Sequence, residues 1–244
     1  MRPALRLTGA ALGIALLPLP FLAAGPAAAE PSIATYEVTI INRALGQPLS
    51  PPVLATHDET VDLFERGRRA SRGVAAIAQA GDQSLAVSRL TSRVGDGVTD
   101  VAEGAPERAL LGVAGPQTTQ TVTIEAVPGD RLSIASMLIC TNDGFTGLDS
   151  KPLPESGTVA YPLFAYDAGV ERNTQRSEHI VDPCSLLGPV ALDGDDNGNV
   201  DTGRVLTSPA QPIGMHRGVG HWGDLQQVHD WSGPVAVVQV TRTS

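Results

Sequence analysis

The sequence predicts an all-β fold, an antiparallel β-sandwich with short helices inserted in the N-terminal half. Apolar and polar residues alternate with a period of two through several runs, a pattern typical of strands that bury one face. The chain also contains 26 glycines and 19 prolines, which suits strands joined by long loops. Because all-β domains of this length often form single units, we expect one sandwich domain over residues 30–244.

Residues 1–29 have the features of a secretory signal peptide. Arg2 and Arg6 precede an apolar run, and residues 27–29 are three alanines of the kind that a signal peptidase recognises. Two prolines interrupt the apolar run, which argues against a membrane anchor. We therefore expect cleavage before Glu30 and an exported protein, secreted or periplasmic, with no transmembrane segment in the mature chain.

The strands are expected in chain order at residues 36–42, 121–126, 132–139, 159–166 and 235–242. In the first of these runs, Tyr36, Val38 and Ile40 share one face. Residues 128–130, with the sequence Pro-Gly-Asp, predict a turn between the second and third runs. We therefore expect those two strands to form a hairpin.

Between the first and second runs the pattern becomes helical. Ser71 is a suitable N-cap for a short helix that buries Val74 and Ile77. Gly81 is a suitable end for this helix, because glycine adopts the left-handed conformation of a helix C-terminus. A second short helix is expected within residues 83–93.

The charge of the mature chain is strongly negative. Loss of the two signal-peptide arginines changes the formal net charge from −9 to −11. This argues against a nucleic-acid partner, because neutralising phosphates requires clustered positive charge. The nearest feature to a basic patch consists of Arg66, Arg68, Arg69 and Arg72. We interpret it as a solvated loop or helix start, with contact to an anionic glycan as the alternative.

The two cysteines, Cys140 and Cys184, are expected to form a disulfide. An exported chain folds in an oxidising compartment, where a lone pair of cysteines is most simply bonded. In the chain-entropy model, a loop of this length would stabilise the fold by about 4 kcal/mol. A thiol nucleophile and a pair of metal ligands are the alternatives, but no CxxC or Cys/His spacing supports them.

Three acidic residues follow two of the expected strands. Asp143 comes after the run 132–139, and Asp167 and Glu171 come after the run 159–166. If both strand ends lie at the same end of the sandwich, the three carboxylates converge and repel one another unless a hard cation lies between them. Calcium suits such a site because it accepts oxygen ligands in loose geometry. The alternative is that these acids are ordinary turn residues.

Three segments resemble the N-terminal spondin domain, which occurs in F-spondin and mindin and in stand-alone secreted bacterial proteins. The segments are residues 136–143, 166–171 and 231–236, and the resemblance extends over about residues 34–242. It implies an antiparallel β-sandwich that binds one Ca²⁺. It also implies that the calcium ligands are an aspartate after one strand and two acids after the next, which correspond to Asp143, Asp167 and Glu171. The animal domains serve matrix and cell-surface recognition.

Two other groups of residues were considered as sites. Residues 193–201 resemble part of a calcium loop, but Arg204 stands where an EF-hand needs a bidentate glutamate. We interpret this segment as a surface loop, with a weak second calcium site as the alternative. His216, His221 and His229 could serve a zinc hydrolase, but their spacing matches no common zinc motif and glycines surround them. We interpret them as structural.

The sequence therefore predicts a secreted, calcium-binding, non-catalytic module for recognition or adhesion. Its partner would be an extracellular or cell-surface ligand, either a protein or a glycan. No nucleophile elbow, phosphate loop or dinucleotide fingerprint indicates an enzyme. The alternatives are a metal-dependent hydrolase that uses the C-terminal histidines, and a structural envelope protein in which calcium serves stability only. We further expect the disulfide to order the calcium loop, because Cys140 lies three residues before Asp143.

Overall fold

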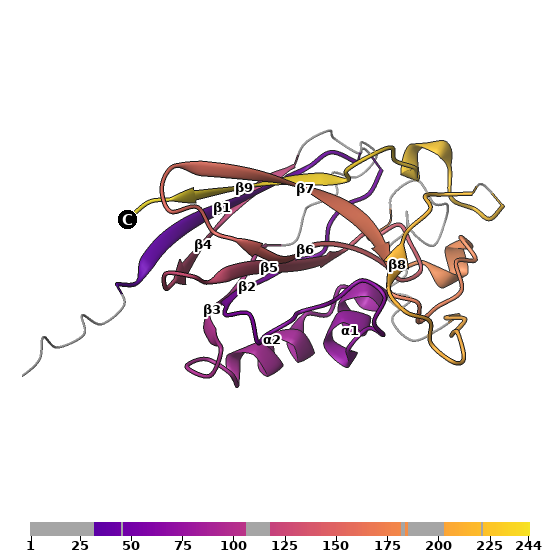
Figure 1. Ribbon diagram of the computed structural model, residues 1–244. Helices are drawn as coiled ribbons and strands as arrows, with labels where there is room; N and C mark the ends of the chain where they lie inside the picture. The colour runs from indigo at the N-terminus through magenta and orange to yellow at the C-terminus, as the bar shows by residue number, and fades with distance from the viewer. Residues whose placement is uncertain (1–31, 45, 106–117, 182–183, 185–202, 221) are drawn as a thin grey trace, which may run out of the picture. The chain divides into compact units, whose positions relative to one another are not determined.

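The computed structural model describes residues 32–44, 46–105, 118–181, 184, 203–220 and 222–244, which contain nine β-strands and two α-helices (Figure 1). The strands are β1 (Ala34–Asn42), β2 (Val53–His57), β3 (Val98–Glu103), β4 (Thr119–Ala126), β5 (Arg131–Met137), β6 (Gly144–Pro152), β7 (Thr158–Asp167), β8 (Gly214–Met215) and β9 (Ala236–Arg242). The helices are α1 (Arg72–Ala80) and α2 (Ser84–Thr91), and the 3₁₀ turns are η1 (Ser177–His179) and η2 (Gln227–His229). The expected signal peptide, residues 193–201 and His221 lie outside the described residues.

The strands form one hydrogen-bonded path that folds into two facing sheets. Its order is β3-β2-β5-β6-β7-β9-β1-β4, every neighbouring pair is antiparallel, and β8 pairs with the end of β7. Strand β7 belongs to both sheets, because residues 158–163 pair with β9 and residues 164–167 pair with β6. The two ends of the path also meet, since the backbone N–H of Glu125 donates to Asp100 Oδ2 at 2.9 Å. The predicted all-β sandwich is therefore confirmed, in a nearly closed form.

One core lies between the two sheets. Tyr36, Val38 and Ile40 of β1 are buried there, as their alternation predicts, in the same cluster as Leu54 of β2 and Ile134 of β5. Alternation identifies β1 because only one of its faces is apolar.

A second core lies between the helices and the other face of the β2–β5–β6 sheet (Figure 1). Val74 and Ile77 of α1 share this cluster with Ala135 and Met137 of β5. The Ser71 hydroxyl accepts the N–H of Val74 at 3.2 Å, and Gly81 ends α1 at φ +64°. The predicted helix and both of its ends are confirmed, and α2 lies within the expected residues 83–93.

The predicted hairpin is wrong, although its turn forms. The N–H of Asp130 donates to Val127 O at 3.1 Å, and Gly129 has φ +96°. Strand β4 nevertheless pairs with β1, whereas β5 pairs with β2 and β6. The turn therefore carries the chain from one sheet to the other instead of joining two partners within one sheet.

No helix among the described residues combines the length and the apolar character needed to cross a membrane.

Candidate functional site

Asp143 and Asp167 lie side by side at one end of the β2–β5–β6 sheet. Asp143 directly precedes β6, and Asp167 is the last residue of β7. The strand register pairs Gly144 with Asp167, and the N–H of Ala168 donates to Asp143 O at 3.0 Å. The two strand ends therefore meet at the same end of the sandwich, as the sequence analysis required.

A tight turn between β5 and β6 sets the position of Asp143. The Thr141 hydroxyl donates to Leu138 O at 2.7 Å and accepts the N–H of Gly144 at 2.8 Å. A Cβ atom on Gly144 would lie 2.5 Å from this hydroxyl oxygen, so the turn requires glycine there. Phe145 then enters the core, where its ring packs against Phe64 with 5.0 Å between centroids.

One carboxylate oxygen of Asp143 organises the loop that follows β7. Asp143 Oδ2 accepts the backbone N–H groups of Val170 at 2.7 Å and of Glu171 at 2.9 Å. The other oxygen, Oδ1, is buried and has no hydrogen-bond partner among the described residues. Because Asp143 is 0 % exposed, water does not compensate this oxygen from the surface.

Glycine makes the loop after β7 tight enough to wrap around Asp143. Gly169 has φ +72°, and a Cβ atom there would lie 2.4 Å from Gln211 O. Its N–H donates to Asp167 Oδ1 at 2.7 Å, while Asn173 Nδ2 donates to Asp167 Oδ2 at 2.6 Å. We define the acidic cluster as Asp143, Asp167 and Glu171. Residues 167–171, within the segment 166–171 that resembles the spondin domain, therefore line this cluster.

Glu171 completes the cluster, and one of its carboxylate oxygens has partners from outside the cluster. Gln79 Nε2 at the end of α1 donates to Glu171 Oε1 at 2.8 Å, and Arg204 Nε lies 3.8 Å from the same oxygen. The second oxygen, Oε2, is buried and lacks a hydrogen-bond partner in the described structure. The side chain is only 1 % exposed.

The acidic cluster carries negative charge that its surroundings do not fully compensate. Burial, and then the charge of Asp167, raises the pKa of Asp143 to about 7. Burial also raises the pKa of Glu171 to about 7, although the Gln79 hydrogen bond and the Arg204 charge oppose the rise. Desolvation disfavours the ionised form of a carboxyl group, so the cluster favours either protonation or a bound cation.

The carboxylate oxygens of the three acids do not converge on a common point in this structure. Among the described residues, the only group of three His, Cys, Asp or Glu residues with ligand atoms all within 4.8 Å of one another is Cys140, Cys184 and His229. Both sulfur atoms in that group belong to a disulfide. An ion held by all three acids therefore requires their ligand oxygens to come closer together than they lie in this structure.

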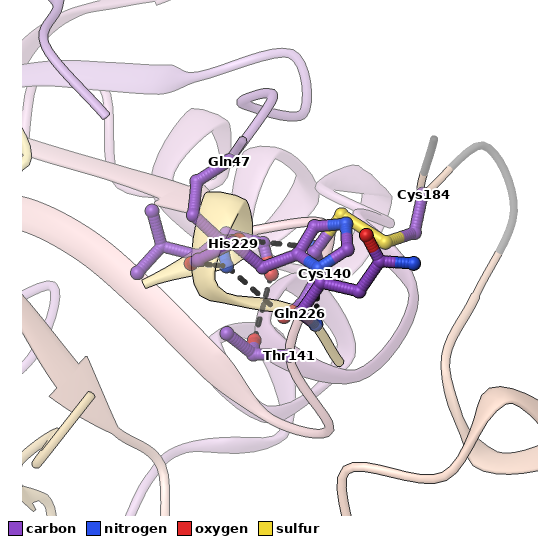
Figure 2. Close-up of a disulfide and its surroundings, with 7 residues drawn as sticks. Gln47, Cys140, Thr141, Cys184, Gln226 and His229 are labelled. Carbon is purple, nitrogen blue, oxygen red and sulfur yellow. Dashed lines mark hydrogen bonds between the residues drawn. A yellow bond between two sulfur atoms is a disulfide. The ribbon is translucent and has the colours of Figure 1, made fainter. Parts of the chain in front are cut away.

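The predicted disulfide between Cys140 and Cys184 is confirmed, with an S–S distance of 2.08 Å (Figure 2). It lies in a buried polar network that the sequence analysis did not identify. Gln47 Nε2 donates to Cys140 O at 3.1 Å and to His229 O at 2.7 Å, and Gln47 Oε1 accepts the N–H of Cys140 at 3.1 Å. His229 Nδ1 accepts the N–H of Gln226 at 2.8 Å. We call these residues the disulfide cluster.

The two described C-terminal histidines do not converge on a zinc site. His229 lies beside the disulfide (Figure 2), whereas the ring of His216 packs against Trp231 with 5.1 Å between centroids. Burial lowers the pKa of His216, and the charges of Asp167 and Asp230 oppose this shift. His221, the third residue of the considered hydrolase site, lies outside the described residues.

Sequence analysis also missed a buried serine–histidine pair. His57 Nε2 lies 2.8 Å from Ser133 Oγ, and His57 Nδ1 lies 2.7 Å from Asp58 O. Both side chains are 0 % exposed, so the pair satisfies polar groups in the interior and offers no access to a substrate. Neither residue belongs to a short motif, and only strand pairing brings them together.

Comparison with protein-family models and with curated proteins finds no match for this chain. The resemblance to the spondin domain therefore stays a prediction that rests on the three segments given above.

Proposed function

We propose that this protein is an exported recognition module whose acidic cluster binds one Ca²⁺. Asp143 Oδ1, Asp167 and Glu171 Oε2 would hold the ion. The calcium would neutralise the cluster and order the loops after β5 and β7 for contact with an extracellular or cell-surface partner. The spondin-like segments support the recognition role, and the acidic cluster supports the metal.

The observation that carries the proposal is the environment of Asp143. One oxygen of this fully buried carboxylate accepts two backbone N–H groups, and the other has no described partner. A buried polar atom without a partner carries a free-energy cost, and a buried charge carries a larger one. A cation bound at Oδ1 removes both costs.

The donor atoms favour a hard cation. The available ligands in the acidic cluster are carboxylate oxygens. Oxygen ligands suit calcium and magnesium, and calcium tolerates the irregular geometry of loops better than magnesium does. Calcium concentrations outside cells also suit sites of the weaker extracellular class.

The test combines metal analysis with melting of the mature protein in calcium and in chelator. Calcium at about 100 times its dissociation constant should add roughly 2.7 kcal/mol of stability. Asp143→Asn keeps an oxygen acceptor for the N–H groups of Val170 and Glu171 but removes the charge. This variant should lose most of the calcium-dependent rise in melting temperature, and so should Asp167→Ala.

Asp130→Asn provides a matched control. Asp130 is 6 % exposed, and its Oδ2 accepts the N–H of Val127 at 2.9 Å, but it lies in the turn between β4 and β5. The control should keep the full calcium shift. If wild type and Asp143→Asn melt identically in calcium and in chelator, the acidic cluster is not a calcium site.

The alternative functions have distinct signatures. An envelope protein stabilised by calcium would show the calcium shift but no ligand whose binding depends on the loops around the cluster. A metal-dependent hydrolase would contain zinc and would lose activity on replacement of His216 and His221 by alanine. Neither alternative has a described group of residues that favours it over recognition.

A further inference from the structure

A surface hollow of about 290 Å³ outside the acidic cluster collects arginines from two separate elements. Arg68 and Arg69 come from the loop before α1, and Arg89 comes from α2. The hydroxyl-bearing Ser71 and the acids Asp62 and Glu65 also line it. We call this site the arginine hollow. The sequence placed two of these arginines together, but only the fold brings Arg89 to them.

The backbone that carries the hollow is held in place. The N–H of Gly67 donates to Ile213 O at 2.9 Å, and the N–H of Ile213 donates to Arg68 O at 2.7 Å. Helix α2 is anchored by Ala86 and Leu90, which are buried in the core beneath it. The arginines therefore extend from fixed positions, which lowers the entropy lost when they bind a ligand.

Two of the three guanidinium groups are available to a ligand. Arg68 Nε pairs with Glu65 Oε2 at 3.1 Å. Arg69 and Arg89 are exposed, and neither has a carboxylate oxygen within 4.0 Å in the described part of the chain. A guanidinium group matches the planar pairs of oxygens on sulfate and carboxylate groups and binds them through two parallel hydrogen bonds.

We propose that the arginine hollow binds a sulfate group of an acidic polysaccharide. Arg69 and Arg89 would pair with the anion, while Asp62, Glu65 and Ser71 would accept hydrogen bonds from sugar hydroxyls. This mixture of cations, carboxylates and a hydroxyl suits a sugar that carries isolated charges. It does not suit a dense run of phosphates, which the net charge of −11 on the mature chain also repels.

The inference names a partner class for the proposed recognition role and rests on that role. The hollow is nevertheless a different site from the acidic cluster, so the two can be tested separately. Its arginines lie in the loop before α1 and on α2, whereas the acidic cluster lies where β6 and β7 meet.

The test measures binding of a chondroitin sulfate hexasaccharide and of its desulfated counterpart by calorimetry. The sulfated sugar should bind at 50 mM salt and weaken at 200 mM salt, because exposed charge pairs are screened. The double substitution Arg69→Gln with Arg89→Gln should weaken binding about tenfold. Arg217→Gln, which removes another exposed arginine after β8, should leave binding unchanged. Equal melting temperatures would show that all variants fold.

Several outcomes would overturn the inference. These are equal binding of sulfated and desulfated sugar, unchanged binding by the double variant, and tighter binding to phosphatidylserine vesicles or to duplex DNA than to the sugar. Asp143→Asn separates this inference from the calcium proposal. Sugar binding without any calcium shift in melting would reject the calcium site alone. An intact calcium shift without sugar binding would reject the arginine hollow alone.

Discussion

The acidic cluster and the disulfide cluster lie at opposite ends of one four-residue turn, residues 140–143, whose end residues Cys140 and Asp143 are both 0 % exposed. In the disulfide cluster, the Gln47 side chain uses both of its polar atoms to satisfy the backbone of Cys140 and His229. In the acidic cluster, Asp143 and Glu171 each keep one buried oxygen without a described partner. Cys140 and Asp143 are therefore equally buried, but the Gln47 side chain satisfies the backbone groups of Cys140, whereas one oxygen of Asp143 has no described partner.

The difference supports the distinction between a structural network and the proposed calcium site. Buried polar groups in native proteins are nearly always paired, so a complete network needs no further explanation than the fold it holds. In the acidic cluster, by contrast, two carboxylates each have one buried oxygen without a described hydrogen-bond partner. A bound cation would supply the interaction that these oxygens lack. Substitutions in the two clusters test this distinction.

Loss of the disulfide should have the largest effect on stability. Replacing both Cys140 and Cys184 by serine releases a loop with a sequence separation of 44 residues. We expect a loss of about 4 kcal/mol, because the unfolded chain regains its loop entropy. The melting temperature should fall by roughly 10 °C for a chain of this size. Thermal melting by circular dichroism measures it, and an unchanged melting temperature would contradict a structural role.

Gln47→Ala should have the next largest effect. The substitution removes three hydrogen bonds, which the Gln47 side chain makes to the N–H and C=O of Cys140 and to the C=O of His229. Gln47 is itself 0 % exposed. We expect a loss of about 3 kcal/mol in urea unfolding, roughly one for each hydrogen bond. Gln211→Ala is the control, because its exposed amide donates only to Pro209 O at 2.9 Å. If both variants lost equal stability, the disulfide cluster would not be the tightly satisfied network described above.

The acidic cluster should show the opposite behaviour, in which removal of a charge helps when calcium is absent. Asp143 and Glu171 have folded-state pKa values of about 7, whereas the pKa of carboxyl groups in the unfolded chain is about 4. Between these pH values the folded state binds more protons than the unfolded state. Without calcium, these two groups therefore lower the free energy of unfolding as the pH rises through this window.

Melting from about pH 4.5 to 7.5 in chelator measures this effect against Asp143→Asn. The wild type should lose stability relative to the variant as the pH rises, by about 3 kcal/mol, since one unit of pKa difference corresponds to about 1.4 kcal/mol. Comparing the two proteins removes the contribution of other acids, such as Asp224, whose pKa is lowered by hydrogen bonds from Ser177. Calcium should abolish the difference in slope. Parallel curves in chelator would contradict uncompensated charge at Asp143.

The sequence predicts the fold best where one pattern decides the structure. Ser71 and Gly81 bound α1 as expected, and the alternation of β1 marks its buried face. Strand β5 (RLSIASM) is buried on both faces, so no alternation marks one face of it, and its partners cannot be inferred from its sequence. The turn at residues 128–130 is correct, but a turn alone does not decide whether the chain returns within a sheet or crosses to another.

The candidate site likewise contains residues that the sequence identifies and residues that only the fold reveals. Asp143, Asp167 and Glu171 are identifiable because they follow apolar runs, and the register of β6 and β7 brings the two aspartates together. Gln79 and Arg204 reach Glu171 from distant parts of the chain, so no local pattern reveals them. Gln47 is equally hidden, because an isolated glutamine in a loop has no sequence signature of burial. The unpartnered oxygens, which carry the functional argument, are visible only in three dimensions.

The smallest effect should appear where the two clusters influence each other. The disulfide fixes the start of the turn that ends at Asp143, so the Cys140→Ser with Cys184→Ser variant should order this turn less before calcium binds. Asn142 still holds the turn, because its amide oxygen accepts the N–H of Gln175 at 3.1 Å and its nitrogen donates to His179 O at 3.2 Å. We therefore expect only about a fivefold weaker calcium affinity, or about 1 kcal/mol.

Calorimetric titration of calcium measures this change, and Asn142→Ala in the disulfide-free background should weaken binding further. Equal affinities in all three proteins would show that the acidic cluster is ordered without its neighbour, and that the shared turn does not couple them.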